Sequence, residues 1–248
     1  MCPIKFPELY RAEFIERPNK FIVNCTFKSD KVFKDYNIDD DIISAHLQDP
    51  GKLPGLLEKG RNLWLRYAGH PGRKTDWSAV LVENPEIENS YISLNSTLPN
   101  RLVEKALKKN GFKEFRDWNL IQSEFTYNTS RWDFLLKNDR GREMLLEVKS
   151  VTWARDKTGL FPDTITARGR KHIEKLTEFH KKKIYKSAVL FIAQRGDIDK
   201  IKPAADIDPQ FALALSKAKK AGVKIMARKT NANTSEVKLG GKIPVIIQ

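Results

Sequence analysis

The stretch MLLEVKS, residues 144–150, decides how the chain is interpreted, because it places Glu147 and Lys149 two positions apart in an otherwise apolar run. A run of this length and composition predicts a buried strand. Side chains alternate between the two faces of a strand, so Glu147 and Lys149 are expected to share one face with Leu145. Opposite charges on such a strand indicate either a structural ion pair or a functional site, and the tripeptide alone does not separate the two.

Asp133 interrupts a second apolar run, SRWDFLL at 130–136. A turn that contains glycine, at 138–141, joins this run to the first, so the two are predicted to form an antiparallel hairpin. Residues on one face of such a pair lie about 5 Å apart at Cβ. The carboxylates of Asp133 and Glu147 would repel each other at that separation unless a cation lay between them. The hairpin therefore favours a metal site over a structural ion pair.

Mg²⁺ or Mn²⁺ suits this predicted arrangement. Mg²⁺ prefers hard oxygen ligands, keeps several waters, and takes one or two carboxylates together with phosphate oxygens of a substrate. Asp133 and Glu147 are the predicted metal ligands, and the backbone carbonyl of Val148 is a further candidate. Lys149, beside the metal, would orient an attacking water or stabilise charge that develops on a phosphate. The predicted catalytic residues are therefore Asp133, Glu147 and Lys149, and the predicted chemistry is phosphodiester hydrolysis.

The charge of the chain favours a polyanion as its partner. Forty-five Lys and Arg residues against 31 Asp and Glu residues leave a net charge of +14, with a pI near 9.7. A basic balance of this size favours nucleic acid. A lysine-rich surface that serves only solubility is the alternative, so the charge carries weight only together with a site.

Composition also excludes several classes of protein. No apolar run approaches the roughly 20 residues that span a bilayer, and the first residues lack the apolar core of a signal peptide. The two cysteines, Cys2 and Cys25, give neither a disulfide framework nor zinc-ligand spacing. Around Gly51 and Lys52 the spacing of a nucleotide-binding P-loop is absent. We therefore expect a cytoplasmic protein with no membrane segment and no haem or nucleotide cofactor.

Residues 9–95 predict a small β-barrel. Short strands separated by turn-forming residues are expected at 21–27, 42–47, 62–68, 77–84 and 90–95. In the first of these, Phe21, Val23, Cys25 and Phe27 alternate and are expected to share one face. Such spacing is typical of an OB-type barrel that binds nucleic acid. Residues 1–88 are therefore predicted to form an OB-like nucleic-acid-binding domain.

The pattern changes near residue 97 and predicts a mixed α/β domain over residues 89–248. Apolar residues at helical spacing predict helices at 97–112, 166–183 and 208–222. Apolar runs of strand length are found at 125–137, 142–154, 187–195 and 223–228. The first two of these strands form the hairpin that carries the acids, and the C-terminal tail is expected to end in an apolar strand.

The arrangement of Asp133 followed by Glu147-Val148-Lys149 resembles the core of the PD-(D/E)xK nucleases, in which a helix, a hairpin and a following helix build a metal-dependent site. Arg131-Trp132 precedes the aspartate in place of proline, a departure that many members of that superfamily share. The sequence does contain a Pro-Asp pair, Pro162-Asp163, but this pair follows Glu147. It cannot supply the first acid of the motif, because that acid precedes the glutamate. Some members carry a further acid on the first helix. Glu104 is therefore a candidate metal ligand, with an ordinary exposed helix residue as the alternative.

Nearly end to end, the chain resembles the sugar fermentation stimulation protein A family. The resemblance rests on the blocks SAHLQDPGKLPGLL (44–57), LNSTLPNRLVEKAL (94–107), RWDFLL (131–136), EVKSVT (147–152), FPDTITARGRKHIEKL (161–176) and DIDPQFALALSKAKKAGVKI (206–225). It implies an OB-like N-terminal domain, a PD-(D/E)xK-like C-terminal domain and DNA as the nucleic acid. It also gives Asp133, Glu147 and Lys149 the positions of the nuclease core's acids and lysine.

Basic residues of the second predicted helix are candidates for contacts with phosphate. Arg168, Lys171 and Lys175 lie at i, i+3 and i+7 and so share a face, with Arg170 beside them. Glutamates alternate with lysines along the same helix, so a solvated surface is the alternative for part of it. His172 is expected to be a packing or surface residue rather than a metal ligand.

Loops of the predicted barrel supply further candidates, Arg73, Lys74 and Lys52, with a structural turn as the alternative for Lys52. The rival to a nuclease is a non-catalytic DNA-binding regulator of sugar-utilisation genes that keeps the nuclease fold. An RNA-directed enzyme is a further alternative, because phosphate contacts carry no base information. The oligomeric state is left open by the sequence.

Overall fold

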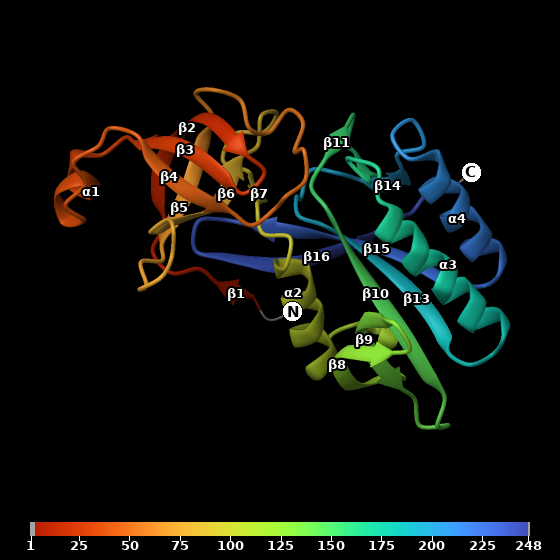
Figure 1. The fold of residues 1–248 in the computed structure, drawn as a ribbon. Coiled ribbons are helices and arrows are strands. Elements are labelled where there is room, and N and C mark those ends of the chain that lie inside the picture. The colour runs from red at the N-terminus through yellow and green to blue at the C-terminus, as the bar shows by residue number, and fades with distance from the viewer. Residues whose placement is uncertain (1–2, 248) are drawn as a thin grey trace.

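Two lobes make up the computed structural model, which describes residues 3–247 (Figure 1). The first lobe is built from β2 (Tyr10–Asn19), β3 (Ile22–Phe27), β4 (Ile43–Leu47), β5 (Asn62–Tyr67), β6 (Trp77–Glu83) and β7 (Tyr91–Ser93). Their order in the sheet is β4-β3-β2-β5-β6-β7, and β4 also pairs with β6 in parallel. This last pairing closes β2 to β6 into a five-stranded barrel, so the predicted OB-like architecture is confirmed.

Alternate residues of the barrel strands face its core. In β3, Val23, Cys25 and Phe27 are buried among side chains from the other barrel strands. The alternation also predicts Phe21 on this face, but Phe21 lies in the turn before β3 and is 45% exposed. The reason is that a turn residue does not follow the pleat of the strand. After β3, a short helix that was not predicted, α1 (Asp30–Asp35), protrudes from the barrel in Figure 1.

A seven-stranded sheet forms the centre of the second lobe, in the order β1-β16-β15-β13-β10-β9-β8. Its strands are β1 (Ile4–Lys5), β8 (Asn119–Tyr127), β9 (Ser130–Lys137), β10 (Glu143–Val151), β13 (Lys186–Ala193), β15 (Lys224–Ala232) and β16 (Glu236–Ile243). β10, β13 and β15 run parallel to one another, and the other neighbours pair in antiparallel. Parallel neighbours need crossover connections, and helices supply them here.

Helices cover both faces of this sheet (Figure 1). On one face lie α3 (Ala167–Lys181) and α4 (Pro209–Lys220), whose residues Ile173 and Phe211 share a core with Leu145. On the other lies α2 (Leu98–Lys108), whose Leu102 shares a second core with Leu146. β10 is therefore buried on both faces, and the predicted mixed α/β domain with flanking helices is confirmed. No helix within residues 3–247 is long and apolar enough to cross a membrane.

Capping residues fix where α3 and α4 begin. Thr166 precedes α3, and its Oγ1 accepts a hydrogen bond from the Gly169 N–H at 3.1 Å. Asp208 precedes α4 and accepts from the Phe211 N–H at 2.9 Å. Side chains of this kind satisfy backbone donors that have no partner inside the helix. The start of α3 is thereby defined, which matters for the functional site because the first turns of α3 lie beside β10.

The predicted hairpin is confirmed between β9 and β10, with Leu135 opposite Leu145. The strand predicted at 125–137 is two strands, because β8 ends at Tyr127, and the chain reverses at Asn128, which has a φ of 53°, and runs back as β9. Also not predicted are a 3₁₀ turn (Lys113–Phe115) and a three-stranded sheet of β11 (Ala154–Arg155), β12 (Thr158–Phe161) and β14 (Lys200–Pro203). These strands are too short to give a periodic signal.

Hydrogen bonds join the two lobes. Thr152 Oγ1, just past β10, donates to Asp49 Oδ2 of the barrel at 3.0 Å. Asn84 Nδ2, just past β6, donates to Asp197 Oδ2 at 2.8 Å. Pairing of β1 with β16 ties the N-terminal segment to the second sheet. The predicted domain boundary, between residues 88 and 89, falls before β7. Because β7 pairs with β6, it belongs to the sheet of the first lobe.

Candidate active site

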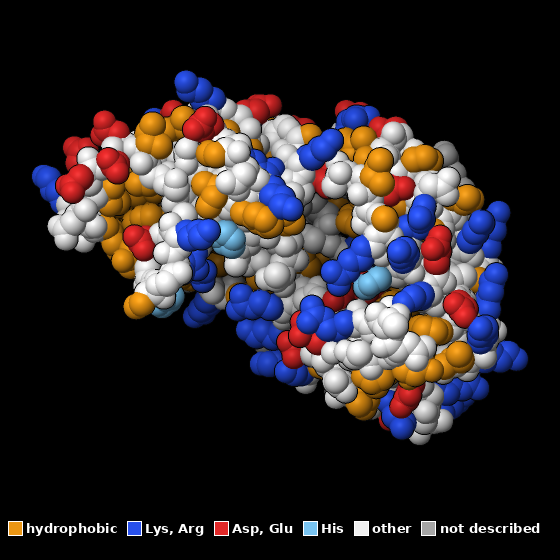
Figure 2. Space-filling model, viewed as in Figure 1, with side chains coloured by type: hydrophobic (Ala, Val, Ile, Leu, Met, Phe, Trp, Pro, Cys, Tyr) orange, Lys and Arg blue, Asp and Glu red, His pale blue; other side chains and the backbone are white. Residues whose placement is uncertain are grey.

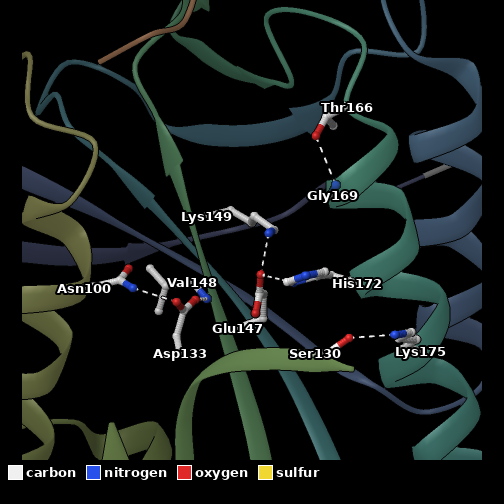
Figure 3. A network of polar contacts seen from close by, with 10 residues as sticks. All are labelled: Asn100, Ser130, Asp133, Glu147, Val148, Lys149, Thr166, Gly169, His172 and Lys175. Atoms are coloured by element: carbon white, nitrogen blue, oxygen red, sulfur yellow. Dashed lines mark hydrogen bonds and ion pairs between the residues drawn. The ribbon is translucent and has the colours of Figure 1, made fainter. Parts of the chain in front are cut away.

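The β9–β10 hairpin brings the two predicted acids to neighbouring positions. Its ladder pairs Leu135 with Leu145 and Phe134 with Leu146. Asp133 and Glu147 are the next residues along the two strands, at the point where the ladder ends. Figure 3 shows the Asp133 side chain on the side of α2 and the Glu147 side chain on the side of α3.

Glu147 is held by two basic side chains. It is only 4% exposed, and its Oε1 accepts hydrogen bonds from Lys149 Nζ at 2.6 Å and from His172 Nδ1 at 2.8 Å (Figure 3). Burial by itself would raise the pKa of this carboxyl, but the charge of Lys149 and the contacts with His172 outweigh burial, and the pKa is lowered. Glu147 is therefore ionised at neutral pH.

Asp133 has neutral partners instead. Its Oδ1 accepts from Asn100 Nδ2 of α2 at 2.7 Å, and its Oδ2 accepts from the Val148 N–H at 2.7 Å. Burial and the neighbouring Glu147 charge raise the pKa of Asp133 from 3.8 to about 6, against the opposing effects of these hydrogen bonds and of Lys149. The repulsion between the two carboxylates that the hairpin predicts is thus present at Asp133.

One carboxylate oxygen at this site lacks a partner. Glu147 Oε2 is buried and has no hydrogen-bond partner among residues 3–247. A buried acceptor without a partner costs about 1–3 kcal/mol, so an unfilled one inside a polar cluster points to a ligand. The donor set is made of carboxylate oxygens, with no grouping of three or more His, Cys, Asp or Glu ligands in the described chain. These residues fit a hard cation that completes its shell with water and phosphate, as Mg²⁺ does.

His172 lies at the centre of this network, although the sequence indicates a packing or surface residue. Its ring packs against the buried Trp132 at 5.2 Å between ring centroids. Its position follows from the helix, because Gly169, Ile173 and Leu176 are buried along α3, and a residue in that stripe faces the sheet. Helical periodicity alone would therefore have placed His172 beside β10. Nothing in the sequence pairs it with Glu147 in particular.

Asn100 is a second site residue that the sequence does not reveal, and it bears on the prediction for Glu104. Both residues lie on α2, one turn apart, but the residue that contacts Asp133 is Asn100. The Glu104 carboxylate accepts from Lys108 Nζ at 2.7 Å and from Ser123 Oγ at 2.9 Å. A metal-binding role for Glu104 therefore stays a prediction. The other predicted site residues do lie together in the structure, namely Asp133, Glu147, Val148 and Lys149.

The basic residues predicted on α3 differ in their surroundings. Arg168 and Lys171 are exposed at the start of the helix. Arg170 is half-buried, with its Nε 3.7 Å from Glu174. Lys175 Nζ donates to Ser130 Oγ at 2.7 Å and so ties α3 to the start of β9. Arg168 and Lys171 are thus the two whose charges are most available to a polyanion near His172.

The barrel residues predicted to bind nucleic acid lie on the other lobe. Arg73 and Lys74 are exposed in the loop before β6, and Lys52 is exposed in the loop after β4. Figure 2 shows a hollow between the lobes, with Lys and Arg side chains gathered on its rims. Basic groups from both lobes therefore border one concave surface.

Comparison with known proteins places this arrangement in a family. Residues 15–94 match the family description "SfsA N-terminal OB domain", and residues 97–236 match "Sugar fermentation stimulation protein RE domain". A sugar fermentation stimulation protein homolog of Shouchella clausii is 39% identical over 244 residues, covering 98% of this chain and 100% of that protein. A homolog of Methanosphaera stadtmanae is 37% identical, covering 89% of this chain and 86% of that protein.

A solved structure has the same fold. The structure of Pyrococcus furiosus SfsA in complex with Ca²⁺ superposes with a TM-score of 0.85 at 24% identity, and the match covers 100% of both chains. The expected architecture, an OB-like barrel followed by a restriction-endonuclease-like α/β domain, is thereby supported by sequence and by structure. The chain belongs to the sugar fermentation stimulation protein family.

Proposed function

We propose that this chain is a nuclease that depends on a divalent cation, Mg²⁺ or Mn²⁺, and hydrolyses phosphodiester bonds in nucleic acid, with DNA as the preferred substrate. The observation that carries the proposal is the pair of Glu147, which is buried, and Asp133, which is partly buried, with Lys149 beside it and Glu147 Oε2 without a partner in residues 3–247. Neither packing nor plain duplex binding requires two carboxylates withdrawn from solvent at adjoining positions.

Each residue of the site has a role in this proposal. Asp133 and Glu147 would hold the cation, with the Val148 carbonyl as a further ligand. When bound, a divalent cation neutralises phosphate charge and acidifies water. Lys149 would leave Glu147 Oε1 to donate to the phosphate or to orient the attacking water. His172 would keep the Glu147 carboxylate in position while Lys149 moves.

The rest of the molecule supports the same substrate. The net charge of +14 and the exposed Arg168 and Lys171 near the site favour a polyanion. The related Pyrococcus furiosus protein was solved with Ca²⁺, a cation that also takes hard oxygen ligands. We also propose that the protein acts in the cytoplasm.

A second candidate is a DNA-binding regulator without turnover. It is favoured by the fact that three of the four carboxylate oxygens are already satisfied. Lys149 and His172 occupy Glu147 Oε1, and Asn100 and Val148 occupy the two oxygens of Asp133. In this candidate the acids hold no cation, and the barrel binds DNA for regulation alone.

A nuclease assay separates the two candidates. Duplex DNA, single-stranded DNA, RNA and a DNA–RNA hybrid are each incubated with Mg²⁺, Mn²⁺ or EDTA. We expect cleavage with either metal and none with EDTA. Glu147→Gln and Asp133→Asn should each lower the rate by about a hundredfold or more, whereas Glu143→Gln, on the same strand but paired with Lys137, should not. Equal digestion by Glu147→Gln and wild type would exclude this site as the source of cleavage. No cleavage of any substrate by the wild type would favour the regulator.

A further inference from the structure

Phe21 is an aromatic residue of the barrel whose side chain lies outside the barrel core. Phe21 stands in the β2–β3 turn and is 45% exposed. Lys20 Nζ lies 4.9 Å from the centre of its ring, at the distance of a cation–π contact. An apolar ring kept at the surface beside a cation is the combination that stacks a base and contacts its phosphate.

The turn that carries Phe21 is held by hydrogen bonds. The Phe21 N–H donates to Asn19 Oδ1 at 2.9 Å, and the Phe21 carbonyl accepts from the Leu47 N–H of β4 at 2.7 Å. Arg17 Nη2 donates to the Lys20 carbonyl at 2.9 Å. The ring is therefore presented by a fixed backbone, so little conformational entropy would be lost when a ligand stacks on it.

Phe21 lines a groove of about 760 Å³ together with His46, Arg73 and Lys74. Arg73 is also held in place, because its Nη2 donates to Ser78 Oγ at 3.0 Å and its Nε donates to the Thr75 carbonyl at 3.1 Å. The groove is thus lined by an aromatic residue from one loop and by cationic residues from another. Its charge complements a polynucleotide backbone.

The topology of the barrel explains why these two loops meet. Ile22, at the start of β3, pairs with His46 of β4, and His46 pairs in parallel with Ser78, near the start of β6. The β2–β3 turn, with Lys20 and Phe21, and the β5–β6 loop, with Arg73 and Lys74, then lie at one end of the barrel. In barrels of this type the loops in these two positions border the face that binds oligonucleotides.

We infer that this groove, which we name the Phe21 groove (Lys20, Phe21, His46, Arg73 and Lys74), binds an unpaired segment of polynucleotide by stacking one base on Phe21. The inference rests on the proposed function only in taking nucleic acid as the substrate. A single strand is favoured over a duplex because an unpaired base exposes its face to a ring, whereas a paired and stacked base does not.

A second cavity is lined by residues of both lobes. Arg17, which holds Lys20, also donates to the Gly51 carbonyl at 2.7 Å. Gly51 and Asp49 line a cavity of about 290 Å³ together with Ser150 and Thr166, and Ser150 directly follows Lys149. A strand whose base stacks on Phe21 would thus continue along the seam between the lobes toward β10. Substrates with an unpaired stretch beside the scissile bond are the class this geometry accepts.

Binding can be tested separately from cleavage. Fluorescence anisotropy is measured in EDTA with a short labelled oligothymidylate, the matching oligouridylate and a duplex of mixed sequence. Phe21→Ala should weaken single-strand binding by about tenfold or more, since stacking contributes roughly 1–3 kcal/mol per base. The salt dependence of the binding constant should be the same for Phe21→Ala as for the wild type, because this substitution removes no phosphate contact. Lys74→Ala should instead lower the salt slope by about one.

Further variants identify the ring as the cause. Phe21→Leu keeps apolar volume without a ring and should bind as weakly as Phe21→Ala, whereas Phe21→Trp should bind at least as well as wild type. Leu213→Ala, an equally exposed apolar residue on α4, is the matched control and should have no effect. Wild-type affinity in Phe21→Leu, or equal losses on duplex and single strand, would overturn the inference. A failed nuclease assay leaves these binding results intact, and a failed binding test leaves the metal site intact. The two proposals are therefore judged independently.

Discussion

Replacing Asp133 with asparagine tests the electrostatics of the site through the stability of the folded protein. The folded-state pKa of Asp133 is raised from 3.8 to about 6, first by burial and then by Glu147. At about 1.36 kcal/mol per pH unit, this rise corresponds to about 3 kcal/mol. An asparagine has nearly the shape of the protonated acid and keeps an acceptor for Asn100 or for Val148, but it cannot ionise.

The direction of the stability change follows from which state, folded or unfolded, loses its proton first as the pH rises. Below pH about 4 the acid is protonated in both the folded and the unfolded chain, so the wild type and Asp133→Asn should be similarly stable. Between pH about 4 and 6 the unfolded chain ionises while the folded chain does not, and the wild type loses stability as pH rises. Above pH about 6 the folded carboxyl ionises as well, and the difference levels off. Asp133→Asn should then be more stable by about 3 kcal/mol.

Urea unfolding of both proteins in EDTA, from pH 4 to 7.5, measures this difference directly. Subtracting one protein from the other cancels the titrating groups that do not interact with Asp133. Asp139→Asn, in the exposed turn of the same hairpin, is the control for the loss of a carboxylate outside the site. Adding Mg²⁺ at pH 7.5 should stabilise the wild type but not Asp133→Asn, because a cation between the acids removes their repulsion. A difference between wild type and Asp133→Asn that stays flat across this pH range would refute the reasoning.

Three other predictions concern single contacts. His172→Ala removes one of the two donors to the site glutamate and should lower the free energy of unfolding by about 1.5–3 kcal/mol, with His172→Gln recovering part of the loss in the same urea titration. Burial raises the pKa of the Cys25 thiol to about 12, so in a Cys2→Ser background a disulfide reagent at pH 8 should react only after unfolding in guanidinium. Gly51→Ala would place a Cβ 2.5 Å from Asp163 Oδ2 at the lobe boundary and should lower the midpoint of thermal unfolding, at a cost of about 1–3 kcal/mol.

The parts of the site that could be predicted are those set by local patterns. Alternation along β10 put Glu147 and Lys149 on one face, and their side chains meet at 2.6 Å. The turn between the two apolar runs predicted the hairpin, and the hairpin register brings Asp133 beside Glu147. Each of these steps depends on a period or a turn within about twenty residues, the range in which sequence patterns have physical force.

The parts that could not be predicted depend on contacts between distant segments. Asn100 and Asp133 are 33 residues apart, and Thr152 and Asp49 are 103 apart. The two members of each pair lie in different elements or loops, so only the packing of α2 and of the barrel against the sheet brings them together. Phe21 is the opposite case, because alternation alone predicts it in the core while the neighbouring turn exposes it.

The two acids have opposite perturbations because the two layers of helices supply different partners. α3 and β10 give Glu147 two basic groups, which keep it ionised although it is buried. α2 and the backbone give Asp133 only neutral donors, which orient its carboxylate but do not neutralise it. Among residues 3–247 the hydrogen-bond partners of Asp133 are therefore uncharged, whereas Glu147 has the ammonium group of Lys149. The cation that we propose, held by Asp133 and Glu147, would lower the pKa of Asp133 and would give Glu147 Oε2 a partner.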